Sequence, residues 1–168
     1  HVTHWFYYLS VDLESDEIDQ IIASDYDLVV IDPIVTEAEN TDYDIAATVD
    51  ALHASMGRNG QPKLVLAYID IGQAESYRAY WQPEWRIGDP EWIVGEDPDG
   101  WVENYPVGYW YDEWQAIWFE AANDGPGLLQ VILDAGFDGI YLDWVEAYSD
   151  YSVLAFAESE GLDAREEM

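Results

Sequence analysis

The chain has 168 residues, enough for one domain with a buried core, and 49% of them are hydrophobic. It carries 36 acidic residues against 5 basic ones, a formal net charge of -31, which argues against binding to nucleic acid or to an anionic membrane. The high hydrophobic content indicates a folded protein. Because so acidic a surface repels itself until molar salt shortens the Debye length to roughly 3 Å, the acidity indicates a halophilic one. The alternative is a merely acidic protein from an ordinary environment.

The first part of the chain alternates apolar runs with helical patterns. We expect a strand at Trp5–Leu9, followed by a short helix with Ser15 as its N-cap. The run Asp27–Asp32 is apolar on both faces between its end residues, which is typical of a buried parallel strand. An acidic helix is then expected over about Asp44–Met56.

The middle of the chain holds a third strand and a long connection. The run Lys63–Asp70 is again apolar and again ends in a carboxylate. Gly72 is expected to open a turn into a helix that continues through Tyr77 and Trp81. Residues 82–106 are rich in Pro, Gly, Trp and acids, which predicts a long loop.

The last part contains the clearest strand of the sequence. Val107–Tyr111 is expected to form a short fourth strand, followed by a helical stretch over 112–135 that is interrupted at 124–127. The run Ile140–Asp143 predicts the fifth strand, and residues 151–168 are expected to be helical.

Strands that alternate with helices predict a parallel sheet with right-handed crossovers. We count about five βα units, whereas a complete barrel has eight and usually about 250 residues. The expected fold is therefore α/β: a (β/α)8 TIM-like barrel, of which residues 1–168 form a single, partial domain holding the N-terminal five or so units. A short open sheet is the alternative.

Three predicted strands end in a carboxylate: Asp32, Asp70 and Asp143. Ligands of parallel α/β folds bind where the carboxyl ends of the strands converge. Cleavage of a glycosidic bond needs two carboxyl groups, one protonated and one ionised. We therefore expect these acids to share one open cleft. Some acids in so acidic a chain will end strands by chance or cap helices, and Asp32 before Pro33 also fits an ordinary turn.

Tryptophan is concentrated between positions 81 and 118, at Trp81, Trp85, Trp92, Trp101, Trp110, Trp114 and Trp118. Flat aromatic faces can bind sugar rings by burying a large area at low entropic cost. Trp92 and Trp101 lie in the predicted loop. They are expected either to bind a sugar ring or to anchor the loop by packing, and the sequence leaves both interpretations open. Trp114 and Trp118 are four residues apart in a predicted helix, which favours the core.

The sequence predicts no cofactor and no metal site. Its three histidines are scattered, and it has neither a metalloprotease motif nor a phosphate-binding glycine loop. It has no cysteine, so a disulfide or a thiolate metal site is excluded. The oligomeric state stays open.

Three segments, in order and correctly spaced, carry a family resemblance. Tyr68–Arg78 resembles the signature Y-I-S-I-G-E-A-E-x-Y-R, and residues 107–115 resemble the segment V-x-Y-W-D-P-E-W-Q of the same proteins. The block GFDGIYLDWVEAY at Gly136–Tyr148 is similar to G-F-D-G-V-Y-L-D-W-V-D-A-Y. These features resemble glycoside hydrolase family 114, the endo-α-1,4-polygalactosaminidase-like barrels, which include members labelled cysteinyl-tRNA synthetase-related.

The resemblance implies a secreted TIM-like barrel that hydrolyses galactosamine-containing polysaccharide without a cofactor. Glu75 matches the acid of the first signature, and Asp143 matches the aspartate of a block that reads E-P-D-N in the family. Tyr141 stands where that block has glutamate, and Asp70 replaces a usual serine. These departures imply either that another acid is recruited or that hydrolysis has been lost.

The leading hypothesis is a glycosidase-like barrel whose catalytic set is Asp143, Glu75, Asp70 and Asp32. Asp143 is expected to be the ionised nucleophile or base, and Glu75 or Asp70 the proton donor. Arg78 is expected to orient a carboxylate through its planar fork. The expected substrate-binding residues are Tyr68, Arg78, Trp101, Trp110, Tyr141 and Trp144.

Two alternatives stay open. One is a non-catalytic carbohydrate-binding protein with a degenerate site, and the other is a half-barrel that completes itself by dimerising. A polysaccharide or oligosaccharide is the partner expected both for the glycosidase and for the carbohydrate-binding protein. An extracellular location is expected, with a signal peptide already removed before His1 or with the chain shortened at that end.

Overall fold

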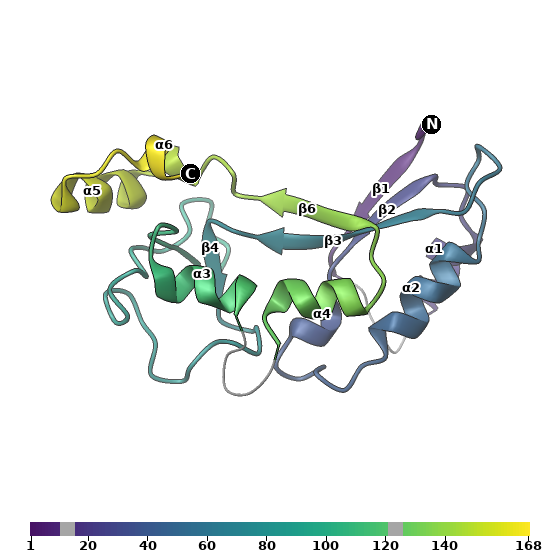
Figure 1. Cartoon of the computed structure of the whole chain (residues 1–168), viewed down its shortest axis with the longest axis horizontal. Helices are drawn as coiled ribbons and strands as arrows, with labels where there is room; N and C mark the ends of the chain where they lie inside the picture. Colours follow the sequence, from purple (N-terminus) through teal and green to yellow (C-terminus); the bar gives the residue numbers. More distant parts are fainter. Residues whose placement is uncertain (11–15, 121–125) are drawn as a thin grey trace. The chain divides into compact units, whose positions relative to one another are not determined.

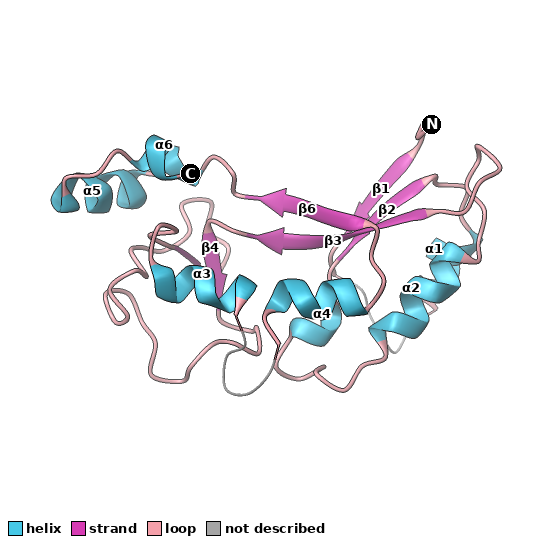
Figure 2. Ribbon diagram, in the orientation of Figure 1, coloured by secondary structure: helices cyan, strands magenta, loops and turns pink. Residues whose placement is uncertain are grey.

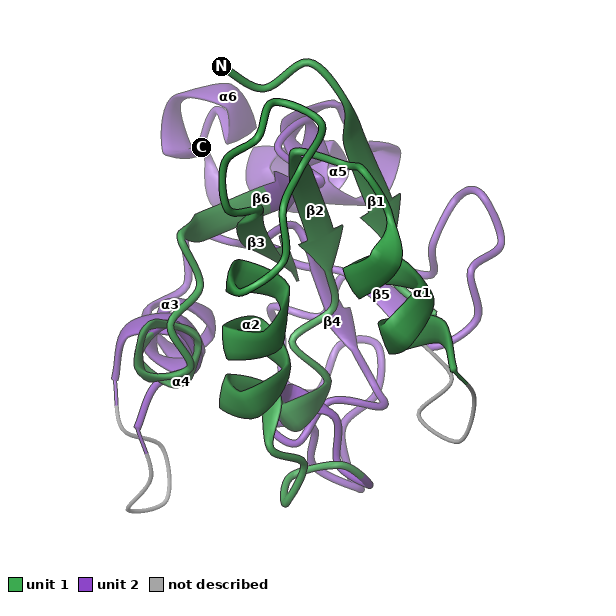
Figure 3. Cartoon of the chain, turned by 90° about the vertical axis from the view of Figure 1, so that its right-hand side faces the viewer, with its two compact units in different colours: residues 1–35, 40–69, 130–141 green, residues 36–39, 70–129, 142–168 purple. Residues whose placement is uncertain are grey.

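The computed structural model describes residues 1–10, 16–120 and 126–168 (Figure 1). Its main sheet has four strands in the order β1-β2-β3-β6, and a separate pair is formed by β4 and β5 (Figure 2). The chain divides into two compact units (Figure 3). Unit 1 comprises residues 1–35, 40–69 and 130–141, and unit 2 comprises 36–39, 70–129 and 142–168.

Unit 1 contains most of the parallel sheet. Its strands are β1 (Trp5–Tyr8), β2 (Leu28–Ile31), β3 (Leu64–Asp70) and β6 (Gly139–Asp143), of which β3 and β6 continue into unit 2. Parallel pairing aligns Tyr7 with Val30 and Val30 with Leu66. Because β2 is covered on both faces, Val29, Val30 and Ile31 are at most 1% exposed, which explains its continuous apolar run.

Three helices lie along one side of these strands: α1 (Glu17–Ala23), α2 (Ile45–His53) and α4 (Leu128–Asp134) (Figure 1). Each contributes apolar side chains to the core, namely Ile21, Val49, Leu52 and Ile132. The start of α2 is fixed by Asp44, whose carboxylate accepts a hydrogen bond of 3.0 Å from the backbone N–H of Ala47.

The strand order favours a barrel-type winding over a doubly wound sheet. The strands of the main sheet follow one another in chain order with helices on one side, whereas a doubly wound sheet reverses its order and carries helices on both faces. The fold is therefore mixed α/β with a four-stranded parallel sheet, as a partial TIM-like domain requires. The sheet is open, with β1 and β6 at its edges.

Unit 2 is built around a short hairpin and an aromatic core. Strand β4 (Gln73–Glu75) pairs antiparallel with β5 (Asn104–Pro106). The helices are α3 (Asp112–Phe119), α5 (Tyr151–Glu160) and α6 (Ala164–Glu167), with two 3-10 turns, η1 (Ile34–Thr36, which begins in unit 1) and η2 (Ala147–Ser149). Trp92, Trp114 and Trp118 are at most 7% exposed, which confirms the prediction of a core position for Trp114 and Trp118.

Two predicted elements are wrong. The helix expected after Gly72 is replaced by β4, because the Asp70 side chain accepts the N–H groups of Gly72 and Gln73 and the next residues pair with β5. The strand expected at Val107–Tyr111 is a turn region, with a single bridge between Ile93 and Val107. The sheet therefore holds four strands where the sequence predicted five.

Other predictions were close, and some fall outside the structure. Strands β1, β2, β3 and β6 and helices α2, α3 and α5 lie within the predicted segments to within a few residues. Ser15, the predicted N-cap, and part of the predicted interruption at 124–127 lie outside the described residues. Among the helices that the structure describes, none has the length and apolar character of a membrane span.

Candidate active site

The candidate site lies at the ends of two neighbouring strands. β3 ends at Asp70 and β6 ends at Asp143, and the backbone N–H of Ile71 donates to the carbonyl oxygen of Asp143 over 3.3 Å. Two residues before these acids, the rings of Tyr68 and Tyr141 stack with centroids 6.4 Å apart. Because side chains alternate along a strand, Asp70 and Asp143 follow on the same face as these tyrosines.

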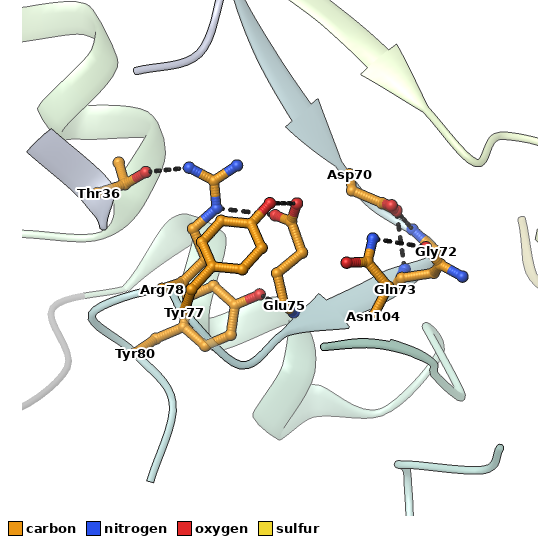
Figure 4. Close-up of polar contacts among 9 residues, drawn as sticks. All are labelled: Thr36, Asp70, Gly72, Gln73, Glu75, Tyr77, Arg78, Tyr80 and Asn104. Carbon is orange, nitrogen blue, oxygen red and sulfur yellow. Dashed lines mark hydrogen bonds and ion pairs between the residues drawn. The ribbon is translucent and has the colours of Figure 1, made fainter. Parts of the chain in front are cut away.

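Asp70 is 1% exposed and ties down the turn that follows β3 (Figure 4). Its Oδ1 accepts the backbone N–H groups of Gly72, at 3.0 Å, and Gln73, at 2.8 Å. Its Oδ2 is buried with no hydrogen-bond partner among the described residues. Burial, followed by the charges of Glu75 and Asp143, raises the pKa of the Asp70 carboxyl well above its usual value. Burial therefore favours the protonated form of the Asp70 carboxyl.

Glu75, on β4, is also buried, but it is compensated. The Nε of Arg78 donates to its Oε2 at 2.8 Å, and the hydroxyl of Tyr77 donates to its Oε1 (Figure 4). Arg78 also donates through a terminal nitrogen to Thr36 Oγ1 at 2.8 Å, and it is 3% exposed. The carboxylate that the Arg78 guanidinium contacts is thus that of Glu75.

Tyr80 supports the strand that carries Glu75. Its hydroxyl oxygen accepts the backbone N–H of Glu75 at 2.8 Å. Burial, and next the charge of Glu75, raises the pKa of the Tyr80 phenol well above its usual value. The phenol therefore stays neutral and fixes the backbone on which Glu75 is carried.

Asp143 is half-buried, which makes it the most accessible of the four acids predicted from the sequence. Its Oδ1 accepts the N–H of Trp144 at 3.0 Å, and Trp144 has a left-handed backbone with φ 55°. A left-handed non-glycine residue is strained, and such strain is found preferentially at functional sites. A Cβ on Gly72 would lie 2.7 Å from both the Trp144 carbonyl oxygen and the Ala147 Cβ, so glycine is required for this close approach.

The open cleft shared by four acids is not what the structure describes. Asp70 and Glu75 are 1% and 2% exposed and lie with Asp143 in unit 2. Asp32 is 3% exposed and belongs to unit 1, where it follows β2. The group assembled by one unit is therefore Asp70, Glu75 and Asp143.

Besides Trp144, which follows Asp143, the aromatic residues predicted to bind sugar fall into three places. Tyr68 and Tyr141 join Tyr7 in a cluster of rings within unit 1, with centroid separations of 5.4 to 6.4 Å. Trp110 stacks on Phe156, and its Nε1 donates to Glu160 at 2.9 Å, so it holds helix α5. Trp101 is 72% exposed.

Sequence reasoning missed the residues that hold the acids in place. Gln73, Tyr77 and Tyr80 lie inside or just after the Tyr68–Arg78 signature, but nothing in their spacing indicates that they contact Asp70, Glu75 or Asp97. Their polar contacts depend on the hairpin of β4 and β5, which the sequence pattern did not predict.

Acids at the ends of adjacent parallel strands place this protein among the α/β folds that bind their ligands at the carboxyl ends of the strands. The chain belongs to glycoside hydrolase family GH114, whose sequence profile matches residues 2–168. The family predicted from the three sequence segments is thereby confirmed.

Three relatives are similar to this chain along most of its length. An uncharacterised protein of Deinococcus radiodurans is 36% identical over 159 residues, which is 95% of this chain and 46% of the relative. Uncharacterised proteins of Thermotoga maritima and Methanocaldococcus jannaschii are 36% and 34% identical, over 86% and 87% of this chain and 39% and 38% of their own lengths. The chain therefore spans less than half the length of each.

Proposed function

We propose that this protein hydrolyses glycosidic bonds of a galactosamine-containing polysaccharide, with Asp143 as the carboxylate that meets the sugar. Membership of GH114 supports the reaction class. The observation that carries the assignment is the difference in burial: Asp143 is half-buried at its strand end, whereas Asp70 and Glu75 are at most 2% exposed.

Asp143 is the acid of the group that a ligand can reach. Glu75 is paired with Arg78, and both Glu75 and Asp70 are buried. An accessible carboxylate at a strand end is what a nucleophile or a base for a glycosidic carbon requires.

Asp70 and Glu75 are better positioning residues than proton donors. A proton donor must reach the leaving oxygen directly or through one water, and neither buried carboxyl is open to a ligand. Their contacts instead fix the turn after β3, the strand β4 and the close approach of Gly72 to Trp144. The proposal assigns no proton donor among the buried acids.

The experiment is a digestion of α-1,4-polygalactosamine by the full-length protein in molar salt. Galactosamine oligomers should be released, and mass spectrometry would detect them; fully N-acetylated polymer and dextran serve as substrate controls. An extracellular location is part of the same proposal, because a polymeric substrate would be met outside the cell.

A second candidate is a carbohydrate-binding protein without hydrolytic activity. It is favoured by Tyr141, which stands where the family block has glutamate and which here stacks on Tyr68. Polymer that is bound but left intact by the full-length protein would select this candidate over the enzyme.

A further inference from the structure

One tryptophan of unit 2 differs from the others in its surroundings. Trp101 is 72% exposed, and its neighbour Val102 is 85% exposed. Ring contacts within the described residues involve six tryptophans: Trp81, Trp85, Trp92, Trp110, Trp114 and Trp118. Trp144 is not among them, but it is half-buried and its backbone N–H donates to Asp143. The packing of unit 2 accounts for the six and gives no reason for a large, exposed indole at position 101.

The loop that carries Trp101, residues 97–104, is held from within the protein. Asp97 is 8% exposed, and its Oδ1 accepts the backbone N–H groups of Asp99 and Trp101, both at 2.9 Å. The ends of the loop are joined by a backbone hydrogen bond from Asp97 to Asn104. The loop is therefore shaped by its own buried aspartate, although its tip is exposed.

Gln73, on β4, connects this loop to the buried carboxyl of Asp70. Its Nε2 donates to Asp97 Oδ2 at 2.7 Å, and its Oε1 accepts from the side-chain amide of Asn104 at 3.1 Å. Its own backbone N–H donates to Asp70 Oδ1 at 2.8 Å, and it is 1% exposed. A continuous chain of hydrogen bonds thus runs from Asp70 through Gln73 and Asp97 to the backbone of Trp101.

We propose that the loop 97–104 is a binding platform for a cationic amino-sugar unit of the polymer, with Trp101 as the contact and Gln73 and Asp97 as positioning residues. This inference rests on the proposed function and names a subsite for it. An indole face attracts both the apolar face of a sugar ring and a nearby ammonium.

The charge of the loop supports an amino sugar over a neutral one. The residues Glu96, Asp99 and Glu103 surround Trp101 in the sequence, and residues 96–104 contain no basic residue. A protonated galactosamine unit is attracted by these carboxylates, whereas an N-acetylated unit is not.

Binding is measured first, independently of hydrolysis, with the full-length protein and α-1,4-polygalactosamine in a titration calorimeter. Trp101→Ala should raise the Kd for the polymer about tenfold, the effect of losing one aromatic contact of about 1.4 kcal/mol. Trp101→Tyr, which keeps an aromatic face, should recover most of the affinity. Phe119→Ala is the matched control, since it removes an equally exposed aromatic ring outside the loop (73% exposed) and should leave Kd unchanged.

The positioning role is tested by how KM and kcat respond. Asp97→Ala removes the acceptor for two backbone N–H groups of the loop, and it should raise KM for long polymer while kcat stays near that of the wild type. Asp97→Asn keeps a carbonyl oxygen for those groups and should restore KM. A general loss of folding would instead lower kcat and the melting temperature together, and would overturn the positioning role.

The outcomes separate the platform from the proposed function. If the wild type binds polymer but does not cleave it and Trp101→Ala weakens binding, the platform stands and hydrolysis fails. If the wild type cleaves polymer and Trp101→Ala binds as tightly as the wild type, the platform is overturned while hydrolysis stands. Equal affinity of the wild type for the N-acetylated polymer overturns the amino-sugar preference.

Discussion

Replacing Asp70 with asparagine should stabilise the folded protein increasingly as the pH rises. The Asp70 carboxyl is 1% exposed, its Oδ2 has no hydrogen-bond partner among the described residues, and Glu75 and Asp143 add negative charge nearby. Its pKa in the folded protein is therefore raised above 3.8, the ordinary value that applies when the chain is unfolded.

The direction of the pH effect follows from this difference. The folded state holds the proton more tightly than the unfolded state, so the contribution of Asp70 to stability is greatest below pH 3.8. This contribution falls as the pH rises toward the raised pKa. Above that pKa the folded protein bears the full penalty of a buried, ionised carboxylate. The asparagine side chain introduced by Asp70→Asn is neutral at every pH and still offers an oxygen to the N–H groups of Gly72 and Gln73, so the variant escapes the penalty.

The size of the effect follows from proton linkage. Between the unfolded and folded pKa values of Asp70, the wild type should lose about 1.4 kcal/mol of stability relative to Asp70→Asn for each pH unit. For a protein of this size 1 kcal/mol moves the melting temperature by about 2 to 4 °C. The assay is urea unfolding of the wild type and Asp70→Asn at pH 5 to 9 in constant molar salt. Asp50→Asn, at an exposed position on α2, is the control.

Two results would refute this reasoning. Parallel stability curves for the wild type and Asp70→Asn across the pH range would show that Asp70 has no raised pKa. A variant that becomes less stable relative to the wild type as the pH rises would show that the ionised carboxylate is stabilised in the fold by a group that the structure does not place there.

Three further predictions concern the fold. Lys63 is 1% exposed and donates to the carbonyl oxygens of residues 24 and 56 at 2.7 and 3.1 Å. Lys63→Met should therefore lower the free energy of unfolding by about 1 to 3 kcal/mol in urea titrations, and unchanged stability would contradict this. Gly72→Ala places a Cβ 2.7 Å from the Trp144 carbonyl oxygen and should cost about 1 to 3 kcal/mol in urea titrations. Gly139→Ala, whose Cβ would meet only the end of the Leu66 side chain at 3.3 Å, should cost less; equal losses would contradict the close-approach argument. Raising KCl from about 0.1 M to about 2 M should raise the melting temperature, because the acidic residues behind the net charge of -31 repel one another less as the Debye length shortens from about 10 Å. A salt-independent melting temperature would count against the halophilic interpretation.

The parallel strands could be predicted from the sequence because their physics is local. Runs such as Asp27–Asp32 and Lys63–Asp70 are apolar on both faces, which only a buried strand satisfies over so few residues. The acids at the ends of β3 and β6 followed from the same runs. The family followed from three ordered segments, and the profile match confirms it.

The hairpin of β4 and β5 could not be predicted in the same way. Residues 73–75 are too few to show a period, and their partner strand, residues 104–106, lies far along the chain. The accessibility of the acids was equally hidden. Tyr77 and Arg78 fold back onto Glu75, and Arg78 is in turn held by Thr36 from a distant segment, which the spacing of these residues does not reveal. The roles of Trp110 and Trp101 also differ only through packing against α5, which sequence spacing does not reveal.

The central claim is that Asp143 acts on a glycosidic bond. The most direct measurement compares the full-length wild type with Asp143→Asn on α-1,4-polygalactosamine in molar salt, following the release of reducing ends together with the Kd for the polymer. We expect the rate to fall by about a hundredfold or more, with Kd changed less than about threefold, because a positioned acid or base contributes about 10²- to 10⁴-fold to the rate. Equal rates for the two proteins would contradict the assignment.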